Sequence, residues 1–487
     1  MTGSELLGFI MLTAMIGAIF IGFPISFTLL FLAFTFGYFG LGGHTVFDLA
    51  YFQTIGMMKE ELLAAVPLFI FMGFITEQAG LMERLFTAFR MLLAPMRGAL
   101  FLVVILTATV FAMATGIVGA SVTVLGIMAA PVMIKTGYDS KLAAGAITAG
   151  GTLGILIPPS VMLIVMGPVL GVSVADLYAA AFGPGFLLAG LYVAYVLVRC
   201  FFDPKLGPPV PKEERVHSLY VLLREVLVGV VPLAALIGST LGSILAGLAT
   251  PTEAAGFGAL GALILAVVYR KLTLGGLKRA VISAMTTSSM VLLLAVTSNI
   301  FGAVFARLGT ANWVTDSMLA LPLPPIAMLT MVIVLIFLLG WPFEWPAIIL
   351  VFLPIFYPVI AALKFDLIWF GALVAVTLQT AYLSPPVAMS AYYLKQVVKD
   401  WSLATIYKGM MEFMVLQCVA VALVIIFPKI ATAFPEYLQH DTRQAPVEQI
   451  KDDAPSLEQD TVEHMQEQSD EASKEGEPPA KNDEKPK

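Results

Sequence analysis

The sequence predicts an all-α membrane protein that crosses the bilayer many times, and three observations lead to this fold class. Of the 487 residues, 59% are hydrophobic and 12% are charged, which is far from the composition of a soluble domain. Apolar runs long enough to cross a hydrocarbon core of about 30 Å recur between residues 6 and 428. The alternating pattern of barrel strands is absent, so the spans are expected to be helices.

The first apolar run is too long for one crossing. Residues 6–39 would form a helix of about 50 Å, so Gly22-Phe23-Pro24 is expected to divide them into two helices. The later spans are expected at 62–80, 98–113 with 121–134, 141–170, 175–200, 226–247, 252–269, 280–306, 325–340 with 346–362, 367–394 and 408–428. The paired segments have half the usual length, and each pair predicts a re-entrant helical hairpin.

The charges divide the chain into a membrane body and an acidic tail. Residues 435–487 contain 15 Asp and Glu against 6 Lys and Arg, a balance of −9, which leaves +3 of the total of −6 for the body. The tail is rich in Glu, Gln, Asp, Pro and Ser and is almost free of aromatic residues. This composition predicts a disordered, solvated segment, and we place it at 431–487.

Basic residues gather in alternate loops, and the positive-inside rule places these loops in the cytoplasm. They agree with one another only if each half-length pair enters and leaves the membrane on the same side. Both chain ends are then expected outside the cytoplasm. The loops contain Arg84, Arg90 and Arg97; Lys135 and Lys141; Arg199, Lys205, Lys212, Arg215 and Arg224; Arg270, Lys271, Lys278 and Arg279; Lys395 and Lys399.

An internal repeat relates the two halves of the chain. An offset of 227 residues places Pro158-Pro159 on Pro385-Pro386, Pro131 on Pro358 and Asp139 on Asp366. Proline and aspartate are uncommon in membrane segments, so these matches favour a common origin. With the topology above the repeats are inverted, which is the architecture of a secondary transporter with a midplane site. The expected parts are scaffold helices at 1–65, a first repeat at 66–200, a cytoplasmic loop with scaffold helices at 201–292 and a second repeat at 293–430.

Each repeat contains a helix that is expected to be broken. Proline removes a backbone donor and clashes with the preceding turn, and Gly150, Gly151 and Gly154 allow the turn before Pro158 to unwind. The freed carbonyls would be costly in lipid unless a polar group fills the break. Together with the hydroxyls of Thr152 and Ser160 they suit a small cation; Gln379, Thr380 and Ser384 stand beside the second break.

The expected hairpin tips differ in character. The first contains small residues, Thr115, Gly116, Gly119 and Ser121, which can bring carbonyls close to a broken helix or simply pack helices tightly. The second contains Glu344, which could bind a cation, carry a proton or face water at the mouth of the site; the last interpretation is favoured because the sequence offers no charged partner.

Enzyme chemistry is not expected. His44, His217, His440 and His464 fall in loops or in the tail, and Cys200 and Cys418 are far apart in the sequence. No nucleotide-binding glycine-rich loop with lysine follows a strand. The sequence therefore predicts no cofactor and no metal other than a transported ion.

Four motifs together resemble one family. The stretches "GTLGILIPPS", "ATGIVGAS", "ATPTEAAGFGAL" and "LQTAYLSPP" look like the large membrane subunit of tripartite ATP-independent periplasmic (TRAP) transporters, and the likeness covers all but the acidic tail. The resemblance implies sodium-driven uptake of an organic acid by an elevator-like body in the bacterial inner membrane. It also implies a small four-helix membrane subunit and a periplasmic substrate-binding protein as partners.

The resemblance also implies positions for the cation sites. By matching motifs, one site falls at Thr115, Gly119 and Ser121 against Gly151, Thr152 and Pro158, and a second at Gln379, Thr380, Ser384 and Pro385. Many members have an aspartate at the second tip and "TPP" at the second break, where this chain has "FEWP" and "SPP". The stretch at 365–386 followed by "YYLK" is similar to a branch associated with 2-oxo acids, mannitol or chloroaromatic compounds. The alternative is a stand-alone divalent-anion:sodium symporter, which would need no capture protein.

Overall fold

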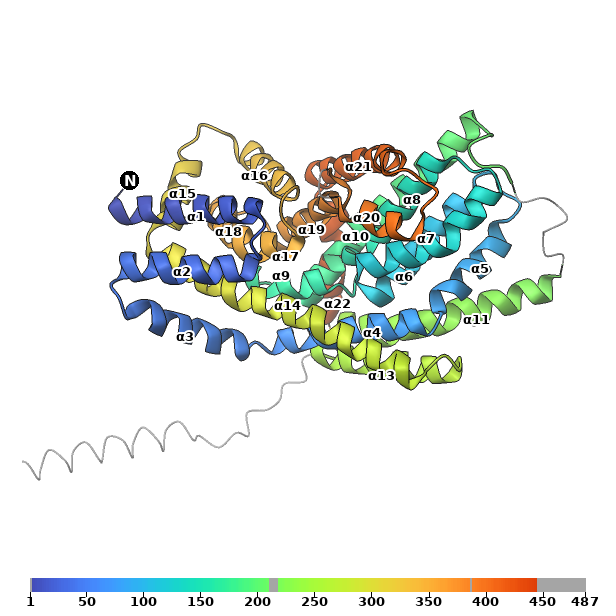
Figure 1. Ribbon diagram of the computed structural model, residues 1–487, viewed down its shortest axis with the longest axis horizontal. Helices are drawn as coiled ribbons and strands as arrows, with labels where there is room; N and C mark the ends of the chain where they lie inside the picture. The colour runs from blue at the N-terminus through green and yellow to red at the C-terminus, as the bar shows by residue number, and fades with distance from the viewer. Residues whose placement is uncertain (1, 210–217, 386–387, 445–487) are drawn as a thin grey trace, which may run out of the picture. The chain divides into compact units, whose positions relative to one another are not determined.

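The computed structural model describes residues 2–209, 218–385 and 388–444 (Figure 1). Lys212, Arg215, His217, Pro386 and His464, all considered above, lie outside these ranges. The regular elements of the described residues are all helices, and nine of these helices are long and apolar enough to cross a membrane. The all-α polytopic fold is therefore confirmed. The chain divides into two units, Met1–Tyr437 and Leu438–Lys487.

The first half of the chain contains ten α-helices. The expected division at Gly22-Phe23-Pro24 is confirmed, and α8 and α9 are the two parts of the first broken helix. In order, the elements are α1 (Gly3–Ile21), α2 (Ile25–Leu41), α3 (Thr45–Met58), the short η1 (Glu61–Ala64), α4 (Ala65–Gln78), α5 (Leu81–Leu93), α6 (Ala99–Thr115), α7 (Val118–Lys135), α8 (Ser140–Thr152), η2 (Leu153–Ile155), α9 (Val161–Leu170) and α10 (Val174–Phe202).

The second half follows the same order. Its elements are α11 (Leu219–Ile237), η4 (Gly238–Gly242), α12 (Ser243–Leu245), α13 (Pro251–Val268), α14 (Leu274–Arg307), α15 (Thr310–Leu319), α16 (Pro325–Leu339), α17 (Trp345–Ala347), η5 (Ile348–Phe352), α18 (Leu353–Ala362), α19 (Leu367–Leu383), α20 (Met389–Val397), α21 (Leu403–Ile426) and α22 (Lys429–Gln444). We call α6 with α7 hairpin 1 and α16 to α18 hairpin 2. Break 1 is 153–160. Break 2 follows α19, and its described residues are 384, 385 and 388.

The two halves keep a constant offset of 227 residues. Shifting α7 by this number gives 345–362, the bounds of α17 to α18 taken together. The same shift brings α8 to the first residue of α19, and α2 to within one residue of the start of α13. The repeat therefore reaches beyond the ranges 66–200 and 293–430 and includes the helices that the sequence assigned to a scaffold.

Local geometry repeats with the same offset. The Asp139 carboxylate caps α8 by accepting from the Leu142 N–H at 2.8 Å, and the Asp366 carboxylate caps α19 by accepting from the Trp369 N–H at 2.9 Å. Left-handed turns also match, because Gly137 has φ 75° and its counterpart Lys364 has φ 57°. An aspartate cap and a left-handed turn thus start each broken helix in the same way.

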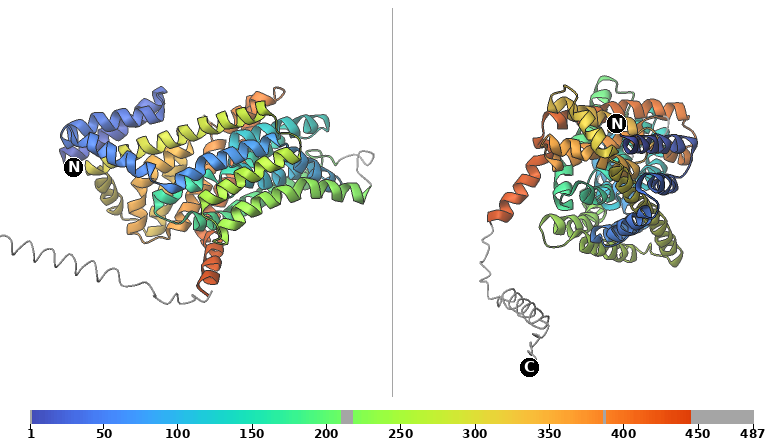
Figure 2. Two further views of the ribbon diagram at one scale, coloured as in Figure 1. Left: turned by 90° about the horizontal axis from the view of Figure 1, so that it is seen from below. Right: turned by 90° about the vertical axis from the view of Figure 1, so that its left-hand side faces the viewer.

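Four helices were not expected. The helices α5 and α15 are short segments that precede the two hairpins, and α3 precedes α4, whereas the counterpart of α3 and α4 is the single long α14. This helix runs beside α2, α3 and α4 (Figures 1 and 2). The fourth is α22, so the expectation of disorder from residue 431 is wrong for 431–444. An ion pair of 2.6 Å joins Lys429 to Glu436 in the first turns of this helix. The rest of the predicted tail, 445–487, lies outside the described residues.

The broken helices lie in the middle of the first unit. Figure 1 shows α19, α20 and α21 near the middle, with hairpin 1 and α8 on one side and hairpin 2 on the other. Glycines allow α8 and α21 to pack closely, since a Cβ on Gly145 would lie 2.6 Å from the Gly409 carbonyl oxygen. At the base of hairpin 1 the Tyr138 hydroxyl accepts from the Leu100 N–H at 3.3 Å, and burial raises the pKa of Tyr138 to about 12.

Candidate functional site

Break 1 is a short irregular segment inside the protein. After Thr152 the chain makes one 3-10 turn, Leu153–Ile155, and resumes a helix only at Val161. The Ser160 hydroxyl donates to the Ile155 carbonyl oxygen at 2.5 Å, which satisfies one acceptor that the break releases. The whole segment is buried, so its remaining polar groups must be satisfied within the protein.

The tip of hairpin 1 packs against break 1. Gly116 turns the tip at φ 61°, and a Cβ on this glycine would lie 3.6 Å from the Pro159 carbonyl oxygen. A Cβ on Gly154 would lie 3.8 Å from the Ser121 hydroxyl oxygen, and the hydroxyls of Ser121 and Thr115 are 3.3 Å apart. The structure thus places Thr115 and Ser121 beside break 1.

The predicted residues of the helix before break 1 are equally close. A Cβ on Gly151 would lie 3.1 Å from the Val122 backbone nitrogen, so only glycine lets α8 approach hairpin 1 here. Thr152 and Pro158 are buried beside it. Gly119 differs, because the ring of Tyr393 fills the space beside its Cα. A Cβ on Gly119 would lie 3.1 Å from the Cζ atom of that ring. Gly119 therefore packs its Cα face against α20.

Break 2 repeats this arrangement. Ala381 holds the position of Gly154, and a Cβ on Gly340 at the end of α16 would lie 3.0 Å from the Ala381 Cβ. Each hairpin therefore approaches the broken helix of its own repeat. Gln379, Thr380 and Ser384 are all buried, and Pro385 follows them directly; Pro386 lies outside the described residues.

Three hydroxyls at the breaks share one hydrogen-bonding pattern. Thr152 donates to the Ala149 carbonyl oxygen at 2.8 Å, Thr380 to the Thr377 carbonyl oxygen at 2.6 Å, and Ser384 to the Thr380 carbonyl oxygen at 2.6 Å. A hydroxyl has one proton and two lone pairs, so each oxygen is left as an acceptor. Neutral oxygens of this kind are ligands for a hard cation such as sodium.

Glu344 is the N-cap residue of α17 in hairpin 2. Its side chain is exposed, and Tyr382 beside break 2 and Tyr393 on α20 both interact electrostatically with it. Tyr393 also covers Gly119, so one aromatic ring lies near both hairpin tips. Neither tyrosine was singled out in the sequence. An aromatic pair close to a helix break and to a hairpin glutamate could have drawn attention to them.

Residues 12–430 match the profile of the tripartite ATP-independent periplasmic transporter, DctM component. The chain belongs to this family. As a DctM component it is a multi-pass membrane permease subunit and not an enzyme, and the resemblance seen in the motifs is confirmed.

This chain has curated relatives of several kinds. It is 30% identical to the sialic acid TRAP transporter large permease protein SiaM of Vibrio cholerae over 86% of this chain and 96% of the relative. It is 28% identical to the C4-dicarboxylate TRAP transporter large permease protein DctM of Rhodobacter capsulatus over 79% and 88%. The isethionate TRAP transporter permease protein DctMQ of Oleidesulfovibrio alaskensis is 30% identical, and 51% of its length is covered.

The fold of this chain is similar to that of a transporter of known structure. The YdaH transporter of Alcanivorax borkumensis superposes with a TM-score of 0.57 over 80% of this chain and 89% of that chain. At 16% identity this likeness shows the fold alone.

Proposed function

We propose that this permease imports an organic acid together with sodium ions. The observation that carries the proposal is that buried neutral oxygens stand at two equivalent helix breaks, each approached by its own hairpin. Sodium is a hard cation that prefers several converging oxygens. Hydroxyls and carbonyls supply these without a fixed charge that would have to move through the membrane.

The proposed cation sites follow the two breaks. Site one comprises Thr115, Ser121, Gly151, Thr152 and Pro158, with Gly119 at its edge; site two comprises Gln379, Thr380, Ser384 and Pro385. In this proposal the cations order the breaks, and an anionic substrate then binds near the hairpin tips, where bound cations and half-helix ends offer positive potential.

The substrate class is proposed from the relatives. Their names give sialic acid, C4-dicarboxylates and isethionate as cargo, and all three are organic acids. Among carboxylates, a 2-oxo acid is the first compound to test here. The hairpins and broken helices are proposed to move as one body against the other helices, in an elevator-like step across the bacterial inner membrane.

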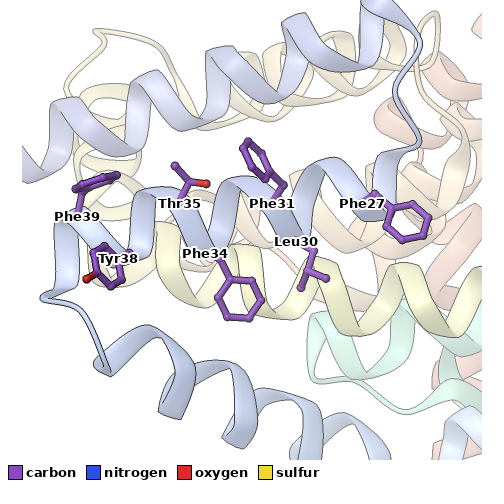
Figure 3. A pocket seen from close by; sticks show the side chains of 7 residues that line it. All are labelled: Phe27, Leu30, Phe31, Phe34, Thr35, Tyr38 and Phe39. Carbon is purple, nitrogen blue, oxygen red and sulfur yellow. The ribbon is translucent and has the colours of Figure 1, made fainter.

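Two partners are proposed: a periplasmic binding protein that delivers the acid, and a small membrane subunit. Exposed and half-buried side chains along α2 line an apolar surface that suits the small subunit (Figure 3). The DctMQ relative, only half covered by this chain, has length for a further segment. The residues of this face are Phe27, Leu30, Phe31, Phe34, Thr35, Tyr38 and Phe39.

The test is uptake of labelled acid into proteoliposomes that contain the chain, its small subunit and the binding protein. Thr152→Val and Ser384→Ala each remove one neutral oxygen, which corresponds to about 1–2 kcal/mol, so each should raise the half-maximal sodium concentration about 5- to 30-fold. Glu344→Gln should change it little. Sodium-independent uptake by the unmodified protein would refute the proposal, and so would loss of the sodium response in Glu344→Gln alone. Equal uptake without the binding protein would favour a stand-alone symporter.

A further inference from the structure

We propose that Tyr192 and Gln417 are positioning residues which, together with Gln379, form a buried polar cluster linking the two cation sites and making sodium binding cooperative. This inference rests on the proposed function, because it concerns how the two sodium sites communicate. Tyr192 lies on α10 and Gln417 on α21, outside both hairpins and both broken helices.

All three side chains are fully buried and short of partners. Tyr192, Gln379 and Gln417 are each 0% exposed. Within the described residues the Tyr192 hydroxyl and both polar atoms of each glutamine side chain have no hydrogen-bond partner. Unpaired polar atoms are costly inside a membrane protein, and an apolar side chain of similar size would avoid that cost. Their presence in the core favours a task other than packing.

The packing of α8 against α21 places Gln417 beside site one. Gly409 packs against Lys141, and Phe413 packs against Gly145, four residues further along both helices. The two helices are therefore parallel in this region, and one more turn brings Gln417 level with Ala149. The Ala149 carbonyl oxygen is the one that accepts from the Thr152 hydroxyl at 2.8 Å.

The packing of α19 against α21 places the same glutamine beside site two. The Trp369 indole donates to the Val424 carbonyl oxygen at 3.0 Å, and the Ser384 hydroxyl contacts the Met414 sulfur at 3.2 Å. The two helices are therefore antiparallel. Gln379 lies between Trp369 and Ser384, five residues before the latter, and this register puts it at about the level of Gln417.

Tyr192 completes the connection. Its ring packs edge-on against Phe413, with the centroids 5.3 Å apart. Its hydroxyl lies close enough to the side chains of Gln417 and Thr152 to interact with them, but not in the geometry of a hydrogen bond. Thr152 and Gln379 are equivalent residues of the two repeats, separated by the offset of 227. The cluster thus runs from a site-one residue through Tyr192 and Gln417 to the matching residue of site two.

This arrangement gives a physical route for cooperativity. When a cation binds at one break, it fixes the orientation of the Thr152 hydroxyl or of the Gln379 amide. Tyr192 and Gln417 then lose alternative orientations, directly or through a bound water. The entropy cost of ordering the second break is therefore lower. The cluster is uncharged, so it transmits order without requiring a charge to cross the membrane.

The experiment compares Tyr192→Phe and Gln417→Leu with Thr107→Val. The Thr107 hydroxyl on α6 is also buried without a partner in the described part of the chain, so this variant controls for the removal of such a group elsewhere. Two quantities are measured: sodium-dependent uptake in proteoliposomes, and the sodium-induced rise in melting temperature of the purified protein.

The two cluster variants should lower the Hill coefficient for sodium toward one and raise the half-maximal sodium concentration about 3- to 10-fold. Their melting temperatures without sodium should be unchanged or higher, since an unpaired group has been removed. The double variant should be little worse than either single variant. Thr107→Val should keep the unmodified response.

The inference is overturned if both cluster variants keep the unmodified Hill coefficient and sodium concentration while the unmodified protein remains sodium-dependent. It is equally overturned if both variants melt lower without sodium and respond normally, because their role would then be structural. A lack of sodium response in the unmodified protein would instead refute the proposed function, and the inference with it.

Discussion

Gly73 on α4 offers a sharp test of the contact between hairpin 1 and the surrounding helices. A Cβ at this position would lie 2.6 Å from the Thr115 carbonyl oxygen, 3.1 Å from its Cα and 3.3 Å from its carbonyl carbon. All three atoms belong to the backbone, so no side chain can rotate away. Gly73→Ala therefore requires α4 and the tip of hairpin 1 to separate by several tenths of an ångström.

The expected size of this effect follows from overpacking, which costs about 1–3 kcal/mol in a tight interior. That energy corresponds to about a 5- to 150-fold shift between two conformations if only one of them contains the contact. In the proposed transport cycle the hairpin moves away from α4, so the alanine should favour the conformation without this contact. Because Thr115 belongs to proposed site one, the half-maximal sodium concentration should also rise.

The assay is the rate at which a membrane-impermeant maleimide labels Glu344→Cys, with Cys200 and Cys418 replaced by serine. Gly73→Ala should change this rate at least several-fold. The matched control is Gly256→Ala on α13, where a Cβ would meet nothing within 4 Å and should only add helix propensity. An unchanged labelling rate and sodium concentration in Gly73→Ala would refute the reasoning.

Three further predictions concern topology, backbone strain and the tail. Cysteines at the equivalent positions Lys135 and Ala362 should be labelled from opposite sides of the membrane. The chain between them makes an odd number of crossings: the broken helix of α8 and α9, then α10, α11, α13 and α14. Labelling of both cysteines from the same side would contradict the inverted topology. Arg270→Gly and Lys364→Gly should each raise the free energy of unfolding by about 0.5–1 kcal/mol. Both residues have a positive φ (55° and 57°), and the equivalent residues of the first half are glycines. Denaturant titration measures the free energy of unfolding. Deletion of 445–487 should leave uptake in proteoliposomes intact, and lost uptake at normal protein levels would show that the segment binds something.

Much of the fold could be predicted because its main signals are local. Length and proline content were enough to find the division at Gly22-Phe23-Pro24, the half-length hairpin arms and the break at Pro158. The helices that escaped prediction lack that signal. Lys59, Glu60 and Glu61 interrupt the apolar run that contains α3. Charged and apolar residues alternate along α5, so the sequence predicts a basic loop rather than a helix there.

The candidate site was predictable only where it follows a motif. Thr115, Ser121 and Gly151 stand beside turns and glycines whose backbone demands are visible in sequence. Tyr192 and Gln417 come from long helices remote in the chain, and their meeting depends on how α21 packs between α8 and α19. Gln417 carried one overlooked signal, an uncharged polar residue in the middle of an apolar span.

The constant offset between the halves also limits where the length of the chain can change. The matched elements from α1 to α21 keep the same spacing in both halves. An insertion within one half would change its spacing relative to the other half. Between the halves the chain is tied up to Gly207, whose carbonyl oxygen accepts from the Gly98 N–H at 2.9 Å, and helix begins again after Ser218. A reporter domain inserted between these two residues, or a division of the gene there into two co-expressed fragments, would leave the spacing within each half unchanged.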